Sequence, residues 1–186
     1  MSQSKTTAVK VSGHIEVYRV DAPGRTLVLA TPNMVVTRGL VVLSEALAGL
    51  GRSTPTAGQV PCDNLVWYMK IGGRTTGTNY QVAAPTAEDT DIQGTELARI
   101  LITSRVQSED GTLVTYRATL PASHPGSNNK DIQDLALFTR GDNDDPYLAT
   151  GSSTRIFARQ VLGPIAKTSE ITLDFVWSVK FDYVAD

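Results

Sequence analysis

The two histidines are the residues best suited to acid–base chemistry, because imidazole titrates near neutral pH. His14 lies on the polar side of an alternating segment, and His124 lies in a proline-containing loop. Neither adjoins the pattern of a catalytic triad, and no serine stands in a Gly-x-Ser-x-Gly motif. We therefore expect two surface histidines and predict no catalytic residue. The alternative is an enzyme that joins a histidine to an acid and a nucleophile from distant segments.

The acidic run Asp142, Asp144 and Asp145 is the best candidate for metal binding, since calcium loops alternate oxygen ligands. However, Tyr147 stands where such a loop needs glycine for its sharp turn, and no glutamate occupies the closing position. We expect a solvated turn and no metal site, with calcium binding as the alternative.

Neither the cysteine nor the glycine-rich run indicates a cofactor. Cys62 is the only cysteine, so the chain cannot form an internal disulfide or a cysteine-rich zinc site. The run Gly72–Gly77 lacks the Gly-Lys-Ser/Thr ending of a phosphate-binding loop. We expect an inert thiol, a flexible surface loop and no cofactor.

Composition narrows the class of protein further. The 186 residues are 41% hydrophobic and 19% charged, with a net charge of -2. These values are typical of a single globular domain and show no basic excess for gripping phosphates. No run approaches the roughly 18 apolar residues of a membrane span, and the first residues lack a secretory pattern. We predict synthesis in a cytoplasm and no direct nucleic-acid or membrane partner.

Alternation with a period of two dominates the chain and predicts β-strands. The strongest case is the last segment, where seven bulky apolar residues occupy every second position from Ile171 to Tyr183. A helix would spread these residues around its circumference. We expect this long strand to lie in the middle of a sheet, with Trp177 and Trp67 in the core. An aromatic platform for carbohydrate is the alternative for the two tryptophans.

Shorter alternating segments predict the other strands. They cover Val9–Val17, Leu27–Ala30, Leu65–Ile71, Leu97–Val106, Leu113–Leu120, Ile132–Phe138 and Arg155–Leu162. The Asp-Gly turn at Glu109–Thr112 joins two of them, with Val106 expected on the apolar face together with Ile100 and Ile102. We expect the last of these strands to stop at Gly163-Pro164.

One helix is predicted after Thr37, with leucines at positions 40, 43, 47 and 50 on a buried face and Gly51 at its end. The fold class is therefore all-β: a β-sandwich or jelly roll of about eight strands with one short helix, in one domain covering residues 1–186. A polar N-terminal segment (residues 1–8) and a long loop (residues 72–94) are candidates for arms that contact neighbouring subunits.

The second half of the chain resembles small virion structural proteins of tailed bacteriophages. Five successive segments carry the resemblance: Gly126-Ser-Asn-Asn129, Ile132-Gln-Asp-Leu-Ala-Leu-Phe138, Arg155-Ile-Phe-Ala-Arg159, Pro164-Ile-Ala-Lys-Thr168 and Leu173-Asp-Phe-Val-Trp-Ser-Val-Lys-Phe181. The first half is similar too, with Ala30-Thr-Pro-Asn-Met34 before an apolar helix. The resemblance carries no site residues.

The resemblance implies a role in virion assembly. The function favoured is a capsid decoration (cement) protein that binds the major capsid protein or other virion proteins, as a homo-oligomer with a trimer favoured. A tail, collar or baseplate component is the runner-up, and a carbohydrate- or receptor-binding module is a further alternative. The implied location is the virion, assembled in the host cytoplasm.

Overall fold

The computed structural model describes residues 7–21, 24–37, 39–41, 43, 66–74, 82–139 and 155–185. Within these residues the chain forms nine strands, which pair antiparallel in one sheet. The strands are β1 (Thr7–Asp21), β2 (Gly24–Val35), β3 (Val66–Gly73), β4 (Thr95–Leu101), β5 (Ser104–Gln107), β6 (Leu113–Leu120), β7 (Lys130–Thr139), β8 (Ile156–Lys167) and β9 (Thr172–Ala185). The predicted all-β class is confirmed, with nine strands instead of about eight.

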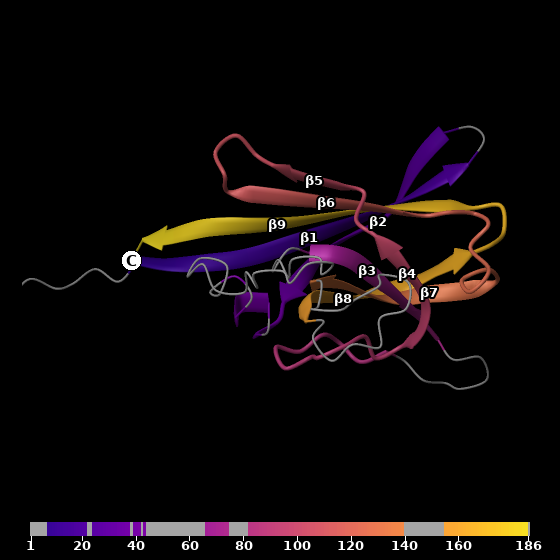
Figure 1. Ribbon diagram of the computed structural model, residues 1–186, viewed down its shortest axis with the longest axis horizontal. Coiled ribbons are helices and arrows are strands. Elements are labelled where there is room, and N and C mark those ends of the chain that lie inside the picture. The colour runs from indigo at the N-terminus through magenta and orange to yellow at the C-terminus, as the bar shows by residue number, and fades with distance from the viewer. Residues whose placement is uncertain are drawn as a thin grey trace, which may run out of the picture.

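The sheet is curled, with the strand order β4-β3-β7-β8-β2-β1-β9-β6-β5 (Figure 1). Its two outermost strands, β4 and β5, are consecutive in the chain and are joined by Ile102 and Thr103. The amide of Ile102 donates to the Trp67 carbonyl in β3, and the amide of Thr103 donates to the Arg117 carbonyl in β6, both at 2.9 Å. The chain therefore passes directly from one edge of the sheet to the other, which brings the two halves face to face.

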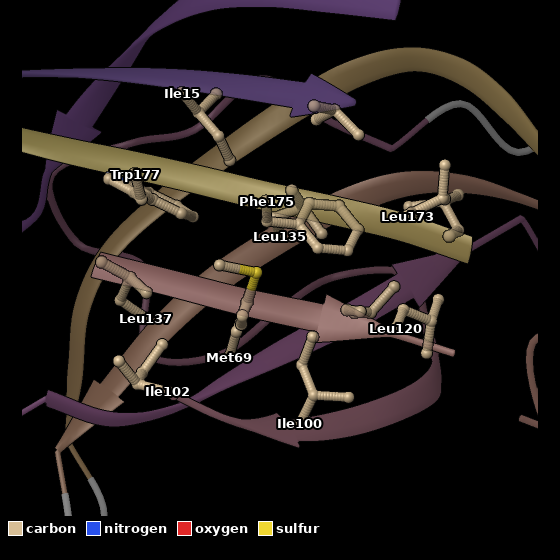
Figure 2. Close-up of a cluster of buried hydrophobic side chains, with 14 of the residues drawn as sticks. Ile15, Met69, Ile100, Ile102, Leu120, Leu135, Leu137, Leu173, Phe175 and Trp177 are labelled. Carbon is tan, nitrogen blue, oxygen red and sulfur yellow. The ribbon is translucent and has the colours of Figure 1, made fainter. Parts of the chain in front are cut away.

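The main hydrophobic core fills the space between these halves (Figure 2). Phe175 and Trp177 from β9, both fully buried, lie opposite Met69 of β3 and Leu137 of β7. As predicted, β9 lies inside the sheet, paired with β1 on one side and β6 on the other. Its alternating apolar residues therefore hold one half of the sheet against the other.

Several predicted details are wrong. Val106 is 55% exposed because Leu97–Val106 is two strands, and the change of direction at Ile102 and Thr103 puts β5 on the outer edge. β8 does not stop at Gly163-Pro164. The register with β7 shifts from Asp134↔Val161 to Ile132↔Ile165, so the strand absorbs both residues as an irregularity and continues.

The predicted helix is present in part, since residues 37, 39–41 and 43 are helical. Leu40 is 46% exposed, against the prediction of a buried leucine face. Leu43 packs against the main core, as predicted, and Gly39 lies so close to β8 that a Cβ there would collide with the backbone of Phe157. Positions 47, 50 and 51 lie outside the described residues. No helix among the described residues has the length and apolar character needed to cross a membrane.

Two further predictions concern the candidate arms. Of residues 1–8, Thr7 and Ala8 belong to β1 and pair with β9, and residues 1–6 lie outside the described part. Gly72 and Gly73 are not loop residues but the end of β3. A side chain at Gly73 would meet Leu97 and the Asp131 carbonyl, so the tight spacing of the strands there requires glycine.

Replacing a core leucine tests which side chains are buried in the hydrophobic core. Leu137→Ala removes a fully buried side chain, so it should lower the free energy of unfolding by about 2–5 kcal/mol. Leu27→Ala makes the same change at a side chain that is 49% exposed, and it should cost less than about 1 kcal/mol. Urea denaturation of both variants measures the difference, and equal losses would contradict the packing.

Candidate functional site

The structure does not assemble the predicted chemistry-bearing residues into one site. His14 lies exposed on β1, with Nε2 4.0 Å from Glu16 Oε1. His124 lies in the loop between β6 and β7, where its Nδ1 is 3.4 Å from Ser127 Oγ. Asp142, Asp144, Asp145, Cys62 and Gly77 lie outside the described residues. Among the described residues, no group of three or more His, Cys, Asp or Glu side chains is arranged to hold a metal ion.

The two tryptophans take different positions. Trp177 is fully buried in the main core, as predicted. Trp67 is only half-buried. Its ring packs against a second apolar cluster, and the Arg105 guanidinium lies 5.0 Å from the ring centroid. Neither indole therefore forms an open aromatic platform of the kind that stacks on a sugar.

The half of the sheet formed by β3, β7 and β8 is buried on both faces. Leu135 and Leu137 of β7 face the main core, whereas Ala136 and Phe138 face the opposite side. There Phe138 stacks on Tyr68, with ring centroids 5.4 Å apart. The segment 82–94 also packs on this opposite side, so the described part of the predicted long loop lies against its own sheet.

A buried ionic network fastens the 82–94 segment to this face, and sequence reasoning missed it. The guanidinium of Arg159 donates twice to Asp134, at 2.9 Å each, and once to Asp89 at 2.7 Å. Its remaining bond goes to the Ala83 carbonyl at 3.1 Å. Arg159 and Asp134 are fully buried. Because every charge has an opposite partner, the network contributes to holding the segment in place.

Hydrogen bonds and opposite charge favour the ionised forms of Asp89 and Arg159 in this network. Burial raises the pKa of Asp89, but hydrogen bonds from Thr86 and Arg159 outweigh that effect and leave the pKa below its ordinary value. Burial likewise lowers the pKa of Arg159, but its bonds to Asp134 and Asp89 raise it overall. The Asp89 carboxylate and the Arg159 guanidinium thus stabilise each other's charged forms.

A second buried cation has a different environment. Lys167, at the end of β8, is fully buried and donates to the carbonyls of Ala122 and Thr168 and to Asn128 Oδ1 at 2.7–3.1 Å. Burial lowers the pKa of its ammonium group. These contacts tie the loop between β6 and β7 to β8, so Lys167 has a structural role in the fold.

The surface feature most suited to binding is the open edge of β2, which we define as residues 24–33. In the described part of the chain, strand pairing of this edge is with β1 alone, because β8 pairs only with Met34 and Val35. Leu27 is 49% exposed and Val28, at a bulge, is 42% exposed. Ala30 and Pro32 are exposed as well. A sheet edge with unpaired backbone groups and apolar side chains is a template for adding a strand.

The polar groups beside this edge are already paired within the chain. On β1, the Tyr18 hydroxyl donates to Glu16 at 2.8 Å, and the Arg25 guanidinium lies 3.7 Å from the Tyr18 ring centroid. The Nε atom of Arg25 also lies 3.7 Å from Oδ2 of Asp174 in β9. The exposed side chains of β2 beside these polar groups are Leu27, Val28, Ala30 and Pro32, and all four are apolar.

Comparisons with protein-family models, with curated proteins and with solved structures found no match to this chain.

Removing one partner of the buried pair tests the importance of the network. Asp134→Asn leaves Arg159 without its principal counter-charge and should lower the free energy of unfolding by about 3–5 kcal/mol. Asp182→Asn breaks the exposed pair with Lys180 and should cost less than about 1 kcal/mol. Chemical denaturation gives both values, and a loss for Asp134→Asn no larger than for the control would contradict a buried ion pair.

The β5–β6 turn yields a pH prediction. Hydrogen bonds from the Ser108 hydroxyl and from the amide and hydroxyl of Thr112 lower the pKa of Asp110 to about 2. Because the folded pKa lies below the unfolded one, the stabilisation is present above about pH 4 and is lost as the pH falls through 2. An NMR titration should place the Asp110 midpoint near 2, and Asp110→Asn should flatten the acid limb of the stability curve. A midpoint near 4 would contradict these contacts.

Proposed function

We propose that this chain is a non-enzymatic structural protein of a tailed-phage virion, a capsid decoration (cement) protein that binds the outer shell by protein–protein contacts. Two independent arguments support the proposal. The sequence resembles small virion proteins over its second half. The open edge of β2 is the single structural observation that carries a protein-binding role.

Strand addition explains how this edge would bind. An extended segment of a neighbouring subunit pairs its backbone with those groups of residues 24–33 that no described strand pairs, and its side chains contact Leu27 and Val28. Pro32 is compatible with this position, because proline in a sheet is confined to edges and bulges. Backbone pairing supplies affinity, and repetition over a symmetric shell multiplies each weak contact.

The remainder of the chain supplies a rigid scaffold for that edge. We interpret the curled sheet as the predicted β-sandwich, with the core of Phe175 and Trp177 between its layers. A rigid edge loses little conformational entropy on binding. Association of several copies, with a trimer favoured, would present several such edges to the major capsid protein or another virion protein.

A tail, collar or baseplate component is the second candidate, since the sequence resemblance favours it nearly as well. The open β2 edge fits either location, because both require contacts between subunits. The carbohydrate- or receptor-binding alternative requires an exposed aromatic platform. The burial of Trp177 and the cover of Arg105 over Trp67 argue against it.

Locating the chain in purified particles tests the proposal. We expect mass spectrometry to find it in many copies per particle and electron microscopy to place it on the outer shell. Density in the tail would favour the second candidate. Recovery of the chain only from the cytosol of infected cells would contradict a virion role.

Substitution on the edge tests the binding surface. Ala30→Lys places a charge on the exposed face of β2, where an added strand would bury it, so the content of this chain in particles should fall at least tenfold. Ala84→Lys makes the same change at an exposed position of the 82–94 segment and should leave the content unchanged. Circular dichroism should show that both variants fold. Normal incorporation of Ala30→Lys would contradict binding at this edge.

A further inference from the structure

The 82–94 segment is attached to the sheet chiefly by polar contacts. Asp89 binds Arg159 of β8 at 2.7 Å, and Asp91 binds the Lys70 ammonium of β3 at 2.8 Å. The amides of Gln93 and Gly94 donate to Asp134 of β7 at 2.7 and 3.1 Å. One segment thus contacts three adjacent strands through charges and backbone amides.

The apolar share of this attachment is small. Val82 is buried and Ile92 is partly buried against the second apolar cluster, whereas most other side chains of the segment are exposed. The ladders that pair β3 with β7 and β7 with β8 use none of its residues. The main core lies on the other face of these strands. Separation of the segment would therefore break few apolar contacts and no strand pairing of these three strands.

Opening this segment costs less free energy than opening a segment held by apolar contacts, because water can replace its polar contacts. When the segment leaves, Arg159 keeps both bonds to Asp134 and gains water in place of Asp89. Asp89 and Asp91 also become hydrated, and an ion pair exposed to water contributes little. The cost of opening is therefore lower than the cost of unfolding the sheet beneath.

We propose that the 82–94 segment opens and closes as one unit, held closed by the Arg159–Asp89 pair, and that its opening removes Ile92 from the second apolar cluster, which contains Tyr68 and Phe138, while the curled sheet stays folded. Besides its contacts with β3, β7 and β8, the segment accepts a hydrogen bond at the Ala87 carbonyl from the Thr37 amide, at 2.8 Å. The segment is thereby also tied to the start of the helix. This conformational device does not depend on the virion role.

Native-state hydrogen exchange of the full chain tests the proposal. Asp89→Asn weakens the contacts of this carboxylate with Arg159, Thr86 and the Gln93 side chain. The readout is the exchange of the backbone amides of Gln93 and Gly94, whose acceptor is Asp134. If the segment moves as one unit, these two amides should exchange about 10- to 100-fold faster, as expected for loss of a charge-assisted bond. The amides of β9 should keep their rates.

Two further variants complete the test. Glu88→Gln makes the matched change on the adjacent, exposed residue, whose carboxylate oxygen lies 3.4 Å from the Thr37 hydroxyl, and should leave all rates unchanged. Asp91→Asn removes the exposed contact to Lys70 and should accelerate the same two amides by a smaller factor. If the Asp89→Asn variant does not fold, the exchange rates of the Asp91→Asn variant test the proposal in its place.

Two results would overturn the proposal. Unchanged exchange at Gln93 and Gly94 in a folded Asp89→Asn or Asp91→Asn variant would show that each contact acts locally. Equal acceleration of these amides and those of β9 would show that the segment unfolds only together with the sheet.

Discussion

The packing of β9 against the opposite half of the sheet is the interaction on which the rest of the structure depends. Phe175 and Trp177 are fully buried and contact side chains from strands that lie far away in the strand order. Ile15, Val17 and Leu120 belong to the same core cluster and add to this apolar contact between the two halves. The direct passage from β4 to β5 then closes the curl at its edges. Both the buried ionic network and the open β2 edge are positioned by this arrangement.

Because β3, β7 and β8 are buried on both faces, the buried charged residues of these strands must find their partners inside the protein. Arg159 and Lys167 belong to the segments that carry the resemblance to phage proteins, and each satisfies its donors inside the fold. Asp134 and Asn128, their partners, belong to those segments too. These polar positions therefore fasten loops to the sheet, and the proposed binding role rests on a different part of the surface.

Local patterns predicted the strands well, because alternation reports the burial of one face directly. The β9 alternation and the Asp-Gly turn before β6 are examples, since both depend on residues close in sequence. The pairing of Arg159 with Asp89 spans 70 positions, so no local pattern supplies it. The one available signal was a charged residue directly after the apolar run Ile156–Ala158. The exposure of Val106 was missed for the same reason. The change of direction at Ile102 and Thr103 depends on their bonds to β3 and β6, which lie far apart in the strand order.

We propose that a rigid curled sheet presents the open edge of β2 to another protein subunit. Amide exchange along residues 24–33 tests it most directly, measured on the free chain and on the chain bound in purified particles. We predict that the amides pointing away from β1 exchange rapidly in the free chain and become protected in the particle. Protection already present in the free chain, or equal rates in both states, would contradict the account.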